Sequence, residues 1–151
     1  MPMLVALHVL AAVAWVGGMF FAYMVLRPAT GPLETRLRLA LWQRVFGRFF
    51  PWVWASIAVL LASGYAMLFL RFGGFTGAGL HIHVMQATGI LMMLLFLHLF
   101  FVPWRRFSCA VEAGNFDSAA VSLNQIRRIV AINLVLGLIT IAAGASGRFW
   151  A

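Results

Sequence analysis

The chain has 151 residues, of which 64% are hydrophobic and only 9% charged, and its mean hydropathy is +1.00. Soluble domains carry about 25% charged residues, so this composition excludes an ordinary water-soluble fold and predicts an integral membrane protein. In a soluble protein the net charge of +8 would favour nucleic acid as a partner. Here the arginines follow the pattern of membrane loops, so we expect membrane lipid, and no nucleic acid, to meet this charge.

Four segments lack Asp, Glu, Lys and Arg, and each is long enough to cross ~30 Å of hydrocarbon as a helix. They cover residues 3–26, 51–70, 80–104 and 129–147. We therefore predict spans at about 3–26, 51–71, 80–104 and 128–147. The connections between them are too short for a soluble domain. The whole chain, 1–151, is expected to form a single membrane domain with an all-α fold, a four-helix bundle.

The first span is expected to end before Pro28, because proline disfavours helical geometry in the residue before it. Between spans one and two, residues 33–49 carry apolar side chains at helical spacing, namely Leu33, Leu37, Leu41 and Val45. Arginines occupy other positions of the same segment, so we predict an amphipathic helix at the membrane interface. Span two is expected to begin near Pro51, and its Ser56 and Ser63 are interpreted as packing contacts between helices.

The arginines set the expected orientation. Apart from Arg71 and Arg148, they all lie in the connections 27–50 and 105–128. By the positive-inside rule these two connections are cytoplasmic, so both termini lie outside. We expect a multi-pass protein of the bacterial inner (cytoplasmic) membrane, with both termini periplasmic.

The last span carries small and weakly polar residues on one face: Asn133, Gly137, Thr140 and Gly144. Such residues let helix backbones approach closely, so this face is expected to pack inside the bundle or across a homodimer. Ahead of this span, Gly114 and Asn115 are expected to end one helix, and Asp117 to cap the next.

Histidines are the first candidates for chemistry, because ionisable residues inside a membrane are costly and usually functional. His8 lies near the start of the first predicted helix and His83 near the start of the third. Both helices start outside, so the two imidazoles are expected at one shallow depth. His98 lies fifteen residues beyond His83, roughly 22 Å deeper, and is a secondary candidate.

Helical spacing places His8, Trp15 and Met19 on one face of helix one, and His83, Gln86, Ile90 and Leu94 on one face of helix three. We expect both faces to point inward, with His81 about 160° away from His83 on the helix. Two inward imidazoles suit axial ligation of haem b between helices one and three. Trp15, Met19 and Gln86 would line the haem, and Arg71 would pair with its propionates.

Copper is the alternative ligand of these residues. An unwound start of helix three would bring His81 and His83 to one ion with His8, and Met85 would supply a thioether for Cu(I). A third hypothesis is a structural accessory subunit of a membrane complex.

No catalytic residue is identified. The acidic residues Glu34, Glu112 and Asp117 all lie outside the spans, which excludes a carboxylate dyad within the membrane. Any enzyme activity is therefore expected to depend on a cofactor. It would be that of a haem-dependent oxidoreductase, which transfers electrons from a quinol or another lipid-soluble donor.

Several motifs resemble a known family. The segments Leu7-His8, Trp15–Phe20, Arg27-Pro28, Phe49–Trp52, Ser63–Tyr65, His81–His83 and Asn133–Gly137 are similar to small bacterial membrane proteins of the copper-resistance protein D (CopD) family. This resemblance implies copper uptake or tolerance. More distantly, the chain resembles HemJ-type protoporphyrinogen oxidases, four-helix haem b proteins, which implies an axial-ligand role for His8. In their pattern a functional lysine stands where this chain has His83.

Overall fold

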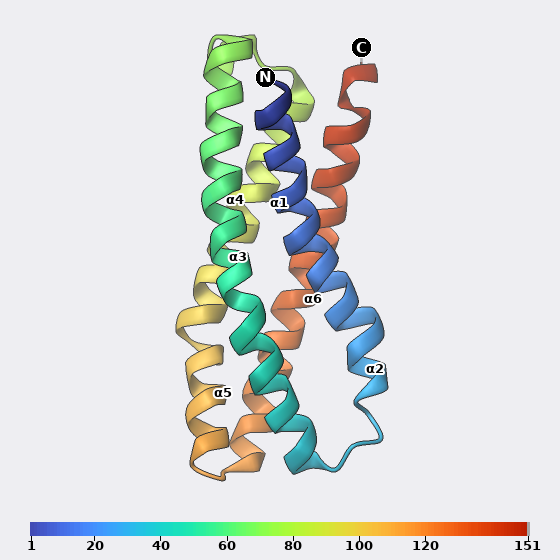
Figure 1. Cartoon of the computed structure of the whole chain (residues 1–151), viewed down its shortest axis with the longest axis vertical. Coiled ribbons are helices and arrows are strands. Elements are labelled where there is room, and N and C mark those ends of the chain that lie inside the picture. The colour runs from blue at the N-terminus through green and yellow to red at the C-terminus, as the bar shows by residue number, and fades with distance from the viewer. Residues whose placement is uncertain (151) are drawn as a thin grey trace.

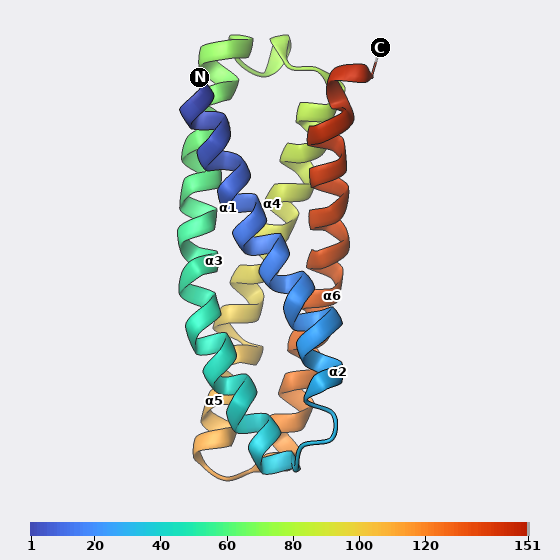
Figure 2. The same ribbon diagram turned by 45° about the vertical axis from the view of Figure 1, so that its right-hand side comes forward.

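The computed structural model describes residues 1–150 as an elongated bundle of helices, and no strand occurs among them (Figure 1). Four helical segments are long and apolar enough to cross a membrane: Pro2–Ala29, Thr35–Phe72, Leu80–Glu112 and Phe116–Phe149. The predicted all-α membrane bundle with four spans is confirmed. Both termini lie at one end of the bundle (Figures 1 and 2), called here the terminal end. The turns at residues 30–34 and 113–115 lie at the other end, called the arginine-rich end because most of the arginines belong to the helical segments near it.

The first span comprises α1 (Pro2–Phe20), the π-helix η1 (Phe21–Leu26) and α2 (Arg27–Ala29). The helix therefore continues past Pro28, beyond its expected end. Proline lacks an N–H and its ring crowds the carbonyl one turn earlier. We attribute the wider π-helical turns before Pro28 to this crowding, since a widened turn relieves it.

The second span, α3 (Thr35–Phe72), is one continuous helix that contains Pro51. The predicted interfacial helix is thus the first half of α3 and not a separate element. Its 38 residues correspond to roughly 57 Å, about twice the hydrocarbon thickness, so a long part of α3 extends beyond the membrane. The buried face carries Leu39, Trp42 and Phe46, whereas Leu37 is 57% exposed.

The remaining elements are the 3-10 helix η2 (Phe75–Gly77), α4 (Leu80–Phe101), α5 (Pro103–Glu112), α6 (Phe116–Ser146) and the 3-10 helix η3 (Gly147–Phe149). Gly73 ends α3 with a φ of 65°, and Gly114 follows α5 with a φ of 72°. Both values lie in the left-handed region that favours glycine. Asn115, and not Asp117, caps α6, since its side chain accepts a hydrogen bond from the Ser118 N–H.

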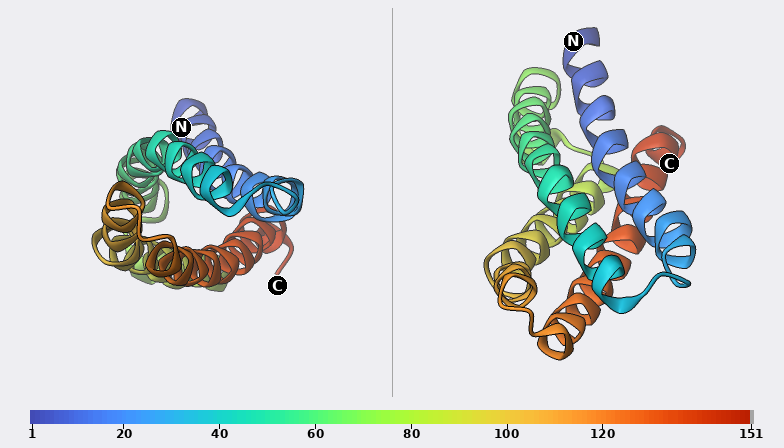
Figure 3. Two further views of the ribbon diagram at one scale, coloured as in Figure 1. Left: turned by 90° about the horizontal axis from the view of Figure 1, so that it is seen from below. Right: turned by 60° about the horizontal axis from the view of Figure 1, so that its bottom comes forward.

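The helices pack in pairs. α1 contacts mainly α3, and α6 contacts mainly α4 and α5. Seen along the long axis, α3 and α2 lie on one side and α5 and α6 on the other (Figure 3).

The best-packed core lies in the half of the bundle away from the termini. There Phe50 stacks on Phe46 with ring centroids 5.1 Å apart, and meets Trp104 edge-on at 5.1 Å and Phe96 at 5.5 Å. All fully buried residues of α4 belong to its second part, namely Met92, Phe96 and Leu99. The half near the termini is consequently held more by polar and small-residue contacts than by a large apolar core.

Candidate functional site

Three hydrogen bonds between side chains join the four long helices in the half of the bundle near the termini. His8 Nδ1 lies 2.8 Å from Ser63 Oγ, Gln86 Nε2 donates to Tyr65 Oη at 3.3 Å, and the hydroxyls of Thr88 and Thr140 are 2.6 Å apart. We call these six residues the polar layer. The two contacts on α3 are two residues apart, as are the two on α4, so the layer spans only about 3 Å of helix rise.

The bond to Ser63 determines which nitrogen of His8 carries the proton. The Ser63 hydroxyl has a single proton, which it donates to the Val59 carbonyl at 2.6 Å. Its oxygen therefore accepts from His8, so Nδ1 is the protonated nitrogen and Nε2 carries a lone pair. A histidine that donates through one nitrogen and is held in place by that bond is the form in which proteins present imidazole to a metal ion.

Gly64 allows the His8 ring to lie directly against α3. A Cβ atom at position 64 would stand 3.2 Å from His8 Cε1 and 3.7 Å from Nδ1. A larger side chain would therefore press on the imidazole and shift it away from Ser63. Ser63 and Gly64 together hold this half-buried histidine against α3, Ser63 by a hydrogen bond and Gly64 by leaving room for the ring.

The expected inward orientation of His83 is not found. His83 is exposed, as are Ile90 (40%) and Leu94 (57%) on the same face of α4, whereas Met92 and Phe96 on the opposite face are buried. The orientation differs from the prediction because α4 is apolar on all sides, so its hydrophobic pattern does not single out an inner face.

His81 has the orientation expected of His83. Its ring lies against the backbone of Gly147 and is 6.4 Å from the Trp150 ring, at the carboxyl-terminal end of the fourth span. It is half-buried. One histidine of the pair faces inward and one outward, as predicted, but the assignment is reversed.

The predicted three-histidine cluster does not form in this conformation. Among residues 1–150 no group of three or more His, Cys, Asp or Glu side chains is placed to hold a metal ion. The Met85 side chain packs on Gly144, with its sulfur 3.2 Å from where a Cβ at that glycine would lie. His8 instead contacts α3 through Ser63.

The other predicted site residues lie as follows. Trp15 and Met19 are buried in the bundle, at 3% and 2% exposure, and Trp15 meets Phe96 edge-on at 6.2 Å. Arg71 is exposed, with its guanidinium 5.8 Å from the ring of Phe72, and His98 is exposed in the last turn of α4. Their proposed roles toward a cofactor stay predictions.

Ser63 and Tyr65 are site residues that the sequence did not single out for chemistry. Ser63 is expected from the sequence to be a packing contact, yet it binds the candidate ligand His8. The available signal was the pair Ser63-Gly64, a hydroxyl followed by the only glycine of the predicted span 51–71.

The fold and the polar layer define a multi-pass helical membrane protein with one oriented imidazole near the terminal end. The family model described as "Copper resistance protein D" (CopD) matches residues 43–146, which include every residue of the polar layer except His8. The chain therefore belongs to the CopD family. No curated protein and no solved structure matches it.

Proposed function

We propose that this chain binds and transports copper in the membrane, with His8 as the first protein ligand of Cu(I). The observation that carries the proposal is the Nε2 lone pair of His8, which the Nδ1 bond to Ser63 leaves free for a metal ion. The description of the family supports copper as the metal. With the termini periplasmic, as the arginine distribution favours, His8 would receive the ion on the outer side of the inner membrane.

Thioethers inside the bundle would receive the ion next. Met85 and Met92, one heptad apart on α4, pack against Gly144 and Gly137 of α6. Sulfur ligands of this kind are preferred by Cu(I). Transport requires sites that bind weakly enough to release the ion, and one imidazole followed by separate thioethers meets this requirement better than a closed cage.

Copper binding by the purified protein tests this proposal. We would load the wild type, His8→Ala and His98→Ala with Cu(I) in detergent, and determine affinity by competition with a chelator. His98→Ala is the matched control, because it removes an exposed imidazole in the last turn of α4, at the end of that helix away from the polar layer. His8→Ala should weaken binding at least tenfold and His98→Ala should not. Equal affinity in the wild type and His8→Ala would reject the role of His8.

Haem b is a second candidate, favoured because the polar layer offers only one protein ligand for a metal ion. A copper site built on His8 needs further ligands from outside the polar layer, because the layer itself offers a single imidazole. A porphyrin brings four nitrogens to its iron, so one histidine is enough to hold it. His83, exposed on the opposite side of α4 from the buried Met92, does not fit as the second axial ligand in this conformation. This candidate gives the protein a redox role with a lipid-soluble partner.

A visible absorption spectrum separates the two candidates. The protein would be expressed with both copper and haem supplied, then measured oxidised and after reduction by dithionite. A Soret band with reduced α and β bands, absent from His8→Ala, would establish haem and reject copper as the resident ligand. A colourless protein that binds copper would reject haem.

A further inference from the structure

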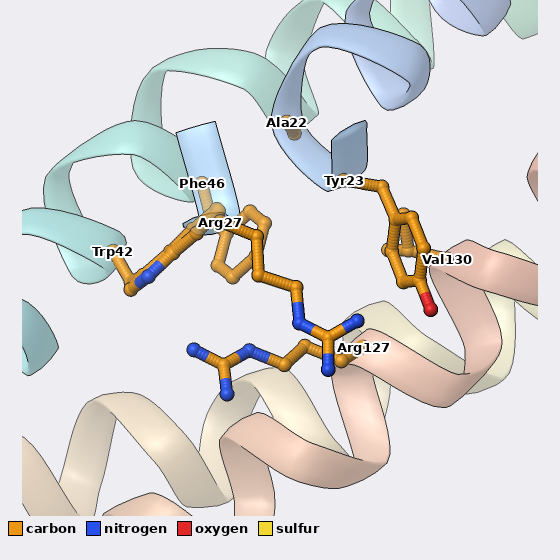
Figure 4. Close-up of a pocket in the computed structure, with 7 residues that line it drawn as sticks. All are labelled: Ala22, Tyr23, Arg27, Trp42, Phe46, Arg127 and Val130. Carbon is orange, nitrogen blue, oxygen red and sulfur yellow. The ribbon is translucent and has the colours of Figure 1, made fainter. Parts of the chain in front are cut away.

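A group of arginines converges at the arginine-rich end of the bundle, far from the polar layer. Arg127 of α6 is half-buried, and Arg27 and Arg38 are close enough for their positive charges to repel the charge of its guanidinium group. Figure 4 shows the guanidinium groups of Arg27 and Arg127 in one space between the end of the first span and α6. Like charges repel one another, and more strongly where one of them is partly withdrawn from water, as Arg127 is, so this arrangement favours a bound counter-ion.

The residues around this space supply no counter-ion. The pocket is lined by Ala22, Tyr23, Arg27, Trp42, Phe46, Arg127 and Val130, none of which is a carboxylate (Figure 4). The arginines have only weak or uncharged partners. Arg27 lies over the Tyr23 ring at 4.9 Å, and Arg127 donates to the Asn124 side chain at 3.5 Å. Arg38 reaches carbonyls of the preceding loop at 3.4 and 3.5 Å.

Two buried donors at this place also have no acceptor. The indole N–H of Trp42 is unpaired although the residue is only 2% exposed, and so is the Nε–H of Arg127. The great majority of buried donors in proteins have an acceptor, so each exception requires an explanation. A water molecule fits in the pocket and can accept from such a donor, and an anion at the mouth of the pocket would neutralise the neighbouring charges.

We infer that this pocket binds the phosphate group of an anionic phospholipid at the inner membrane surface. A phosphate presents several charged acceptor oxygens, which suit converging guanidinium groups. The space itself encloses only about 10 Å³, enough for a water molecule, so the phosphate sits at its mouth. With the arginine-rich end cytoplasmic, the pocket lies at the level of the headgroups of the cytoplasmic leaflet, where anionic lipids attract basic residues.

Lipid titration of the delipidated protein in detergent tests the inference. Phosphatidylglycerol and phosphatidylcholine with the same acyl chains would be added to the wild type, Arg127→Gln and Arg27→Gln. Bound lipid would be counted by native mass spectrometry. The control is Arg44→Gln, which removes the same charge from an exposed position outside the pocket. The wild type and Arg44→Gln should prefer phosphatidylglycerol, and each pocket variant should lose about fivefold of that preference.

Inorganic phosphate, titrated against bound phosphatidylglycerol, identifies the source of the anion. If phosphate displaces phosphatidylglycerol only at concentrations far above that of the lipid, the pocket is a headgroup site. If phosphate displaces the lipid at similar concentrations, the ligand of the pocket is a soluble phosphate and the lipid inference is wrong. Arg27 is exposed, so Arg27→Gln is informative even if Arg127→Gln fails to fold. A preference unchanged in the folded pocket variants, or lost equally in Arg44→Gln, would overturn the inference.

Discussion

Ser63→Ala should weaken metal binding at His8 without removing the ligand itself. The substitution deletes the oxygen that accepts from His8 Nδ1 at 2.8 Å, so neither the ring orientation nor the position of its proton is fixed any longer. Loss of such a supporting bond costs about 10–100-fold in metal affinity, or about 1.4–2.8 kcal/mol. The bond from Ser63 to Val59 lies within α3, so only one interhelical bond is lost. The fold should therefore be destabilised by only about 0.6 kcal/mol.

Competition with a Cu(I) chelator would give the affinity, and thermal unfolding in detergent would give the stability. Ser56→Ala is the control, since Ser56 is buried on the same helix about 10 Å away from Ser63 along the axis. An affinity unchanged in Ser63→Ala, or reduced equally in Ser56→Ala, would refute the argument that Ser63 orients the imidazole. If the protein proves to hold haem, the same variant should retain less of it.

Three further predictions concern packing and the second histidine. Phe107 is 0% exposed, so Phe107→Ala should cost about 3–5 kcal/mol, measured as a large fall in the unfolding temperature. Gly137→Ala places a Cβ 2.8 Å from Val16 and 3.2 Å from Met92, so it should lower the free energy of unfolding by about 1–3 kcal/mol. Gly89→Ala is the control, because its Cβ meets nothing within 4 Å, and it should not lower the unfolding temperature. His81→Ala should leave copper affinity within about twofold, because His81 packs on Gly147 and not beside His8; a tenfold loss would restore the three-histidine site.

The amino-acid sequence alone was enough to predict the class of fold. Long segments without charge specify membrane helices, since the cost of burying an ionised group in hydrocarbon dominates all local preferences. The small and weakly polar face of α6 was expected to pack inside the bundle or across a homodimer, and its first part packs inside the bundle. Asn133 is 2% exposed and donates to the Met92 carbonyl, and Gly137 packs against Met92 and Val16.

Local signals were less informative about helix boundaries. Pro28 and Pro51 were expected to mark an end and a start, yet both lie within helical segments. In a bundle, neighbouring helices compensate for the hydrogen bond that a proline removes, and a π-helical stretch absorbs its ring.

The sequence by itself determined that this protein has four membrane helices and an imidazole, His8, on the inner face of the first. Only the tertiary structure decided that His81, and not His83, turns inward on α4. That helix is apolar on every side, so hydrophobicity does not select the face that is buried. The selection is made by shape: Gly137 and Gly144 of α6 leave room for the side chains of Met92 and Met85, and these contacts fix the rotation of α4 and its histidines.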